Sequence, residues 1–323
     1  MLILRRLAEA AVVVLIMSLL VFLGIYAIGN PVDILVNPQA NQIEIARATA
    51  ALGLDKPLWE QYLLFLWNAL HGDMGRSFVF NQPSISLILQ RMPATLELAT
   101  SAMVIAVVLG IPLGLWAALR PNGAVNEIIT TGSILGFSLP IFWVGLMLIL
   151  VFAVWLGWLP STGRGETVSI LGIDTSLLTW DGLAHIALPA TNLALFKLAL
   201  IIRLTQAGAR ETVLADYIKF ARAKGLHPAR IIFVHLLKNI LIPIITVIGL
   251  EFGAVIAFAV VTETIFSWPG MGRLIIASIG VLDRPVIVAY LMMTVLMFVI
   301  INLVVDILYS ILDPRVRMGQ RQA

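Results

Sequence analysis

The sequence contains no cysteine and little charge for its length. Of the 323 residues, 12% are charged and 60% are hydrophobic, and the mean hydropathy is +1.00. Soluble domains carry about 25% charged residues and about 45 to 50% apolar residues, so this composition excludes a soluble globular domain. The lack of cysteine excludes disulfides and thiolate metal sites. The chain therefore needs lipid to cover its apolar surface.

Motifs that would make the chain an enzyme are missing as well. The sequence has no Gly-x-x-x-x-Gly-Lys-Ser/Thr run, so it has no phosphate-binding loop of the kind that ATPases use. Neither His-Glu-x-x-His nor Gly-x-Ser-x-Gly occurs, and the four histidines are scattered along the chain. The net charge of +3 does not indicate nucleic-acid binding, because the basic residues lie between apolar runs. We expect no catalytic residue, no metal site and no cofactor in this chain.

Six apolar stretches are long enough to cross a bilayer core of roughly 30 Å, which takes about 20 helical residues. These stretches are Leu7–Ile28, Leu96–Leu119, Ile128–Leu156, Ile186–Leu204, Ile240–Val261 and Val286–Leu312. The third stretch is long enough to tilt or to contain a break at Pro140. The expected fold class is therefore all-α, a polytopic membrane protein with about six transmembrane helices.

The spans divide the chain into three expected parts. Residues 1–29 hold the N-terminal end and the first span, 30–95 form an outer segment with interfacial helices, and 96–323 hold five spans with a basic loop at 205–239. The first span is too long for a signal-peptide core and no Ala-x-Ala follows it, so we expect an uncleaved anchor. In the outer segment, Pro57 is predicted at the first position of a helix. Its aromatic side chains suit the headgroup level: Trp59, Tyr62, Phe65 and Trp67.

The distribution of lysine and arginine predicts the orientation, because cytoplasmic loops carry the excess of these residues. An even number of spans places both termini on one side. That side holds Arg5, Arg6, Arg120, Arg203, Arg210, Lys219, Arg222, Lys224, Arg230, Lys238, Arg315, Arg317 and Arg321. The other side holds Arg47, Lys56, Arg76, Arg91, Arg164, Arg273 and Arg284, spread over longer loops. Both termini are therefore expected in the cytoplasm.

The cytoplasmic loop between the fourth and fifth spans has the pattern of a short, bounded helix. Asp216 is predicted to cap a helix over Tyr217–Lys224, and Gly225 to end it in the left-handed conformation. Pro228 then starts a second helix over Ala229–Asn239. One face of the first helix is predicted to form an apolar knob: Tyr217, Phe220, Ala221 and Lys224. Such a knob contacts a partner, or it packs on the chain's own helices or at anionic lipid.

This loop resembles the EAA loop of binding-protein-dependent ABC importer permeases, in particular those of the dipeptide, oligopeptide and nickel branch. The resemblance covers Asp216-Tyr217-Ile218-Lys219-Phe220-Ala221-Arg222-Ala223-Lys224-Gly225-Leu226 and His235-Leu236-Leu237-Lys238-Asn239. Further matching segments occur in order along the chain: Leu52 to Pro57, Gly72 to Ser77, Ser138 to Trp143, Thr262 to Gly270 and Asp313 to Arg317. Within the loop, Lys219 and Lys238 replace the acidic residue and the proline of the general pattern.

The resemblance implies a type I ABC importer permease that acts as a transport subunit and is not an enzyme. The loop would then hold the coupling helix, which docks on a separate ATPase subunit through Asp216, Tyr217, Lys219, Phe220, Ala221, Arg222, Ala223, Lys224, Gly225 and Leu226. The implied partners are a second, homologous permease in a heterodimer, two ATP-binding-cassette ATPases that bind ATP and Mg, and a periplasmic substrate-binding protein. The implied location is the bacterial inner membrane, and residues 30–95 would be periplasmic.

Two ionisable residues lie deep within predicted spans, Lys197 in the fourth and Glu251 in the fifth. A charge at the bilayer centre costs roughly 2.5 to 3.5 kcal/mol on insertion scales, so both side chains should face protein or a cavity. We expect them to line the translocation path, or to form a structural salt bridge if the two helices adjoin. Two small-xxx-small pairs, Gly110 with Gly114 and Gly249 with Gly253, favour close helix packing.

The last outer segment, residues 263–284, is an expected gate or binding-protein contact, or else an interfacial loop without function. Its suggested contact residues are Trp268, Pro269, Gly270 and Gly272. Within this family a peptide is the expected substrate, and a nickel chelate or glutathione is the alternative. An ion-coupled secondary transporter is a further alternative, because such proteins are equally apolar, but the sequence shows no convincing internal repeat.

Overall fold

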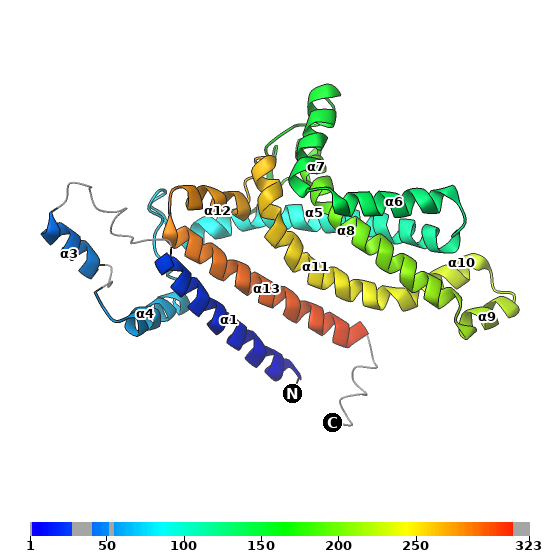
Figure 1. The fold of residues 1–323 in the computed structure, drawn as a ribbon, viewed down its shortest axis with the longest axis horizontal. Coiled ribbons are helices and arrows are strands. Elements are labelled where there is room, and N and C mark those ends of the chain that lie inside the picture. Colours follow the sequence, from blue (N-terminus) through cyan, green and yellow to red (C-terminus); the bar gives the residue numbers. More distant parts are fainter. Residues whose placement is uncertain (1, 28–40, 52–54, 313–323) are drawn as a thin grey trace. The chain divides into compact units, whose positions relative to one another are not determined.

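The structure is a computed structural model that describes residues 2–27, 41–51 and 55–312 (Figure 1). Its helices belong to two compact units, each made from segments that are far apart in the sequence. The first unit comprises described residues of Met1–Met92 and Gly270–Val299, and the second those of Pro93–Pro269 and Ile300–Ala323. The return of residues 270–299 to the first unit was not predicted from the sequence.

The first unit contains helices α1, α3, α4 and α12, together with one end each of α5 and α13. Their bounds are Leu2–Ala27 for α1, Gln42–Ala51 for α3, Leu58–Leu70 for α4, Ser84–Leu119 for α5, Met271–Gly280 for α12 and Arg284–Leu312 for α13. Val21 of α1 packs with Val288 and Met292 of α13, and Phe65 of α4 packs against this cluster. Pro57 is the N-cap of α4, so the predicted helix starts one residue later than expected.

The second unit contains the rest of α5, a helical bundle and a small β-hairpin. The elements are α6 (Ala124–Ser138), α7 (Ile141–Leu148), η1 (Ile149–Trp155), β1 (Val168–Ile170), β2 (Ile173–Thr175), α8 (Trp180–Val213), α9 (Asp216–Ala223), α10 (Pro228–Arg230), η2 (Ile231–Leu236) and α11 (Leu237–Ile265). Strands β1 and β2 are antiparallel, with Val168 opposite Thr175. Helix α8 packs against α6, α7 and α11. It therefore lies within the bundle of this unit.

The helix lengths confirm a polytopic all-α membrane protein. Within the described part of the chain, four helical stretches are long and apolar enough to cross a membrane: Ser84–Leu119, Trp180–Val213, Pro228–Ile265 and Arg284–Ile307. Helix α6 with α7 and η1 makes a fifth span if the bent pair is counted as one, and α1 contributes a shorter apolar stretch, Ala8–Gly24. The bend falls at Pro140, as expected, because Leu139 is extended and a residue before proline disfavours the helical region.

Small residues bring α8 against α5, as the glycine spacing predicted. A Cβ on Gly110 would lie 2.7 Å from Cγ2 of Ile201, and a Cβ on Gly114 would lie 2.7 Å from the backbone oxygen of Ile202. These distances are below normal contact, so only glycine allows this approach. On α11, a Cβ on Gly249 would lie 2.3 Å from Val305 of α13. The tight helix packing of the second unit therefore depends on these three glycines.

The basic loop expected at 205–239 is mostly helical. Helix α8 continues to Val213, and the chain from Pro228 to Ile265 is one further helical stretch that includes a π-helical segment, η2. Only residues 214–215 and 224–227 lie outside helices in this region. The connection is therefore a compact hairpin built on the ends of two long helices, with α9 at its tip (Figure 1).

Candidate functional site

Helix α9 begins at Asp216, and Ala215 is its N-cap residue. The prediction that Asp216 caps the helix is wrong, because the helix starts one residue earlier than expected. The carboxylate of Asp216 instead accepts a hydrogen bond from Lys219 Nζ, at 2.9 Å. As the first helical residue, Asp216 still places a negative charge at the positive end of the helix dipole.

The C-terminal end of α9 confirms the role predicted for Gly225. This residue has φ +74°, the left-handed conformation that glycine adopts without strain. The Leu226 N–H donates to the carbonyl of Ala221 at 3.2 Å, and the Gly225 N–H donates to the carbonyl of Arg222 at 2.9 Å. These two bonds form a Schellman motif, which satisfies carbonyls that the helix end would leave unpaired. The turn is therefore set by local hydrogen bonds.

The buried and exposed residues of α9 are not distributed as the predicted apolar knob requires. Ile218 and Ala221 are buried against Ile231 of η2, and Leu226 packs on the same cluster. Ala221 therefore belongs to the interior of the hairpin, and its predicted place on an exposed knob is wrong. The residues of α9 that stay exposed are Asp216, Tyr217, Lys219, Phe220, Arg222 and Ala223.

The exposed face of α9 combines aromatic and basic groups. Phe220 is 62% exposed, and Lys224 Nζ lies 4.5 Å from the centre of its ring. The hydroxyl of Tyr217 accepts a hydrogen bond from Asn239 Nδ2 at 3.0 Å, which ties α9 to α11. The face is thus an aromatic surface with cations around it, held rigidly on the hairpin.

The second candidate feature is the pair of charges in the predicted spans. Lys197 on α8 and Glu251 on α11 form an ion pair, with Nζ 2.5 Å from Oε2. The prediction that the two side chains can pair is confirmed. The Lys197 side chain is 15% exposed and that of Glu251 is 32% exposed. Farther along the same two helices, Asn192 Nδ2 donates to Thr262 Oγ1 at 3.1 Å, so polar contacts fix the register of α8 against α11.

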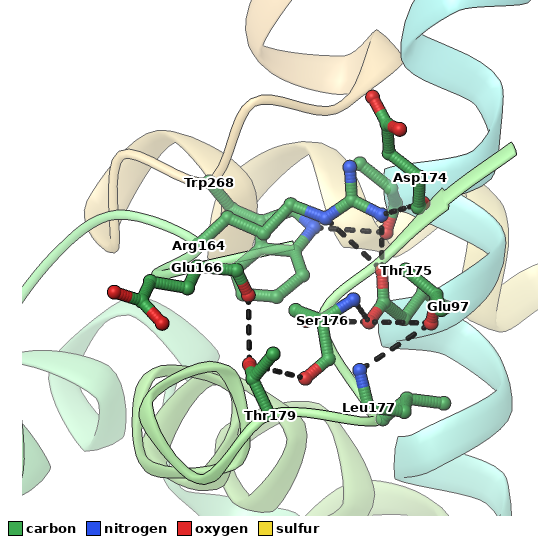
Figure 2. Close-up of polar contacts among 10 residues, drawn as sticks. Glu97, Arg164, Glu166, Asp174, Thr175, Ser176, Leu177, Thr179 and Trp268 are labelled. Atoms are coloured by element: carbon green, nitrogen blue, oxygen red, sulfur yellow. Dashed lines mark hydrogen bonds and ion pairs between the residues drawn. The ribbon is translucent and has the colours of Figure 1, made fainter. Parts of the chain in front are cut away.

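A third cluster, centred on Glu97 of α5, was not predicted (Figure 2). Oε2 of Glu97 accepts from Arg164 Nε at 3.0 Å and also from Arg164 Nη2. Oε1 accepts from the backbone N–H of Ser176 at 2.8 Å and from its hydroxyl at 2.5 Å. The Glu97 side chain is only 5% exposed. Its carboxylate therefore holds the loop between η1 and α8 against α5 through a satisfied buried network.

Arg164 connects this network to the backbone and to an aromatic ring. Its Nη2 donates to the carbonyl of Asp174 at 2.6 Å, and its guanidinium carbon lies 6.0 Å from the ring centre of Trp268. The Trp268 Nε1–H donates to the carbonyl of Ala94 at 2.8 Å. Nearby, Glu263 is fully buried and accepts from Thr95 Oγ1 at 2.6 Å. These contacts make Trp268 a structural anchor of the second unit (Figure 2).

The burial of Trp268 bears on only one of its two suggested roles, the binding-protein contact, and a role in a gate stays a prediction. The side chain has no exposed area, and a contact with a soluble binding protein needs an exposed side chain. Gly270, the N-cap of α12, and Gly272 in its first turn are buried as well, and Pro269 is partly buried. The segment as described therefore offers little surface at the four suggested positions.

One signal for the Glu97 network was present in the sequence. Glu97 is an ionisable residue just inside an apolar span, and such residues are expected to have a partner. The partner lies far along the chain, at Arg164 in a glycine-containing loop, and no periodic pattern connects the two. The pairing needs the fold of the loop, which contains the positive φ residues Gly163 and Gly165.

The fold and the polar contacts together define a multi-pass α-helical membrane protein whose long helices enclose few, specifically paired charges. Comparison with known proteins then identifies its family. The sequence profile of the "Binding-protein-dependent transport system inner membrane component" matches residues 110–318, and the profile of the N-terminal part of such components matches residues 1–99. The chain belongs to this family of ABC importer permeases, which are transport subunits and not enzymes.

The curated relatives match over nearly the full length. The dipeptide transport system permease protein DppB of Escherichia coli (strain K12) is 39% identical over 98% of both chains. The di/tripeptide transport system permease protein DppB of Pseudomonas aeruginosa (strain UCBPP-PA14) is 41% identical over 90% of both chains. Among solved structures, a chain of the MetNI methionine ABC transporter has a TM-score of 0.54 at 15% identity, covering 70% of this chain and 96% of that chain. This last likeness supports the type I permease fold.

Proposed function

We propose that this chain is a permease subunit of an ATP-driven importer that moves dipeptides or oligopeptides across the bacterial inner membrane. The observation that carries the proposal is the match of 39% identity over 98% of both chains to a dipeptide permease. The peptide is preferred to a nickel chelate or glutathione because the two relatives described above are named as dipeptide and di/tripeptide permeases.

The proposed mechanism is alternating access, with energy supplied by partner subunits. A second, homologous permease would complete the path, a periplasmic binding protein would deliver the peptide, and two ATPase subunits would bind ATP and Mg below the membrane. Both termini would lie in the cytoplasm, as the lysine and arginine distribution indicates. ATP can shift the permease between two conformations only if the ATPases bind those conformations with different free energies.

Helix α9 is the proposed contact with the ATPase. Its exposed Phe220 and Tyr217 stand on a hairpin whose buried side, Ile218 and Ala221, packs against the start of the helical stretch that contains α11. A displacement of α9 would therefore act on a transmembrane helix through packed side chains. The basic groups around Phe220 are suited to an acidic rim of a partner cleft.

Co-purification tests this proposal. The chain, carrying one affinity tag, is expressed with the other subunits encoded by its own transport system, and the purified complex is analysed for subunit stoichiometry. We expect one copy of this chain, one copy of the related permease and two ATPase subunits, with ATP hydrolysis stimulated by the peptide-loaded binding protein. Purification of this chain without any ATPase subunit, from membranes that contain them, would contradict the proposal.

A further inference from the structure

Two ion pairs among the described residues of the second unit, Arg164–Glu97 and Lys197–Glu251, differ in how many of their donors and acceptors are used. Both oxygens of Glu97 accept hydrogen bonds, from Arg164 and from Ser176. Among the described residues, Lys197 and Glu251 make one hydrogen bond, which they share. A lysine ammonium has three donors, and a carboxylate can accept about four hydrogen bonds. The Lys197–Glu251 pair therefore keeps spare capacity for both a negative and a positive group.

The location of the pair makes this spare capacity unusual. Lys197 lies at the middle of α8, and Glu251 is equally far from Leu237 and Ile265, the two ends of α11. Glu251 nevertheless remains 32% exposed and Lys197 15% exposed. Because a charge in hydrocarbon costs roughly 2.5 to 3.5 kcal/mol on insertion scales, this exposed side should face water or protein and not lipid.

A buried ion pair that is kept for stability alone usually has its remaining donors and acceptors satisfied, because the attraction between its charges otherwise fails to offset desolvation. The Glu97 network fits this description and the Lys197–Glu251 pair does not. The unused donors of Lys197 can bind an anionic group, and the unused acceptors of Glu251 beside them can bind a cationic group. A molecule with a carboxylate and an ammonium group is complementary to both.

We propose that Lys197 and Glu251 form a two-point binding site for the charged termini of a peptide in transit, an inference that rests on the proposed function. The ammonium of Lys197 pairs with the peptide's C-terminal carboxylate, and the carboxylate of Glu251 pairs with its N-terminal ammonium. The ion pair opens as the peptide enters and closes again as it leaves. The four charges sum to zero in the occupied site, and each charged group always has an opposite charge beside it, so no step leaves an unpaired charge in the membrane.

A double-neutral variant, Lys197→Met with Glu251→Gln, separates recognition from packing, because it removes both charges together and leaves neither unpaired. The variant is assembled with its partner subunits in proteoliposomes, and uptake of radiolabelled Ala-Ala is measured at saturating binding protein. We expect normal assembly and at least an about tenfold loss of uptake, since a site built for a charged group discriminates strongly against its absence. The charge-retaining variant, Lys197→Arg with Glu251→Asp, should keep more uptake than the double-neutral variant, because each peptide terminus still meets an opposite charge.

Uptake by the assembled double-neutral variant at the unaltered rate would overturn the inference while leaving the proposed function in place. A complete lack of Ala-Ala uptake by the unaltered importer would instead contradict the proposed function itself. The two failures are therefore distinguishable. If the double-neutral variant does not assemble, the next experiment decides, because it uses the unaltered chain.

In this second experiment, radiolabelled Ala-Ala is bound to the unaltered permease–ATPase complex in nanodiscs without binding protein. Unlabelled Ala-Ala, N-acetyl-Ala-Ala and Ala-Ala amide are then compared as competitors. Each blocked peptide lacks one terminal charge and should displace the label at least about tenfold less well, because one of the two charged groups then stays unpaired. Equal displacement by all three, or no saturable binding of Ala-Ala, would overturn the inference.

Discussion

Replacing Phe220 by alanine should weaken the docking of the ATPase subunit and leave the α9 hairpin folded. Phe220 is 62% exposed in the isolated chain, so most of its surface is available for burial against a partner. Complete burial of a phenylalanine side chain is worth about 1.5 to 3 kcal/mol. Scaled by the exposed fraction, the loss on docking is roughly 1 to 2 kcal/mol, which is about 5- to 30-fold in the dissociation constant.

The assay is binding of purified ATPase to the permease in nanodiscs, with limited proteolysis of the hairpin as a measure of folding. Phe220→Ala should lower affinity without increasing cleavage. Ala221→Asp should lower affinity and increase cleavage, because it buries a carboxylate beside Ile218 and Ile231. Phe80→Ala, at a 44% exposed phenylalanine of the predicted outer segment, is the control and should change neither. Unchanged ATPase affinity in Phe220→Ala would refute the docking role of this face.

Three further predictions concern a turn, helix packing and a buried ion pair. Gly225→Val should destabilise the hairpin by about 1 to 3 kcal/mol, because a β-branched residue resists φ +74°. Gly225→Asn should be tolerated. The two variants are compared by their rates of proteolysis. Gly114→Leu should lower the melting temperature of the purified chain, since a Cβ there would lie 2.7 Å from a backbone oxygen of α8, and Gly132→Ala, with nothing within 4 Å, should not. Arg164→Met should lower the free energy of unfolding by about 3 to 5 kcal/mol, because Glu97 then stays buried without its cation. Adding Glu97→Gln to this variant should recover part of that stability. A double variant as unstable as Arg164→Met alone would contradict the pairing.

The membrane spans could be predicted, because long apolar runs have few structural alternatives. The ends of the helices that contain these spans could not be predicted. Helix α5 begins at Ser84 and not at Leu96, since its first turns contain charged and polar residues that lower the local hydropathy. Helix α8 likewise continues beyond Leu204 to Val213, through the charged residues Arg210 and Glu211. Hydropathy marks the part of a helix inside the bilayer, whereas the helix itself continues into the loops.

The candidate site was predictable where a local rule applied. Gly225 was identified because a helix end needs a residue that tolerates positive φ, and the Lys197–Glu251 pair because charges inside spans need partners. The inward face of Ala221 was not predictable, since helical spacing groups residues on a face without telling which neighbour covers it. The Arg164–Glu97 network also depends on tertiary contacts, because its members come from separate segments.

The central claim is tested most directly by measuring which energy source drives peptide uptake. Proteoliposomes containing the complete importer are loaded with ATP or with a non-hydrolysable analogue, and uptake of radiolabelled Ala-Ala is followed with and without a proton or sodium gradient. The account predicts uptake that requires hydrolysable ATP and the binding protein and is independent of either gradient. Uptake by this chain alone, driven by an ion gradient in the absence of ATPase subunits, would contradict it.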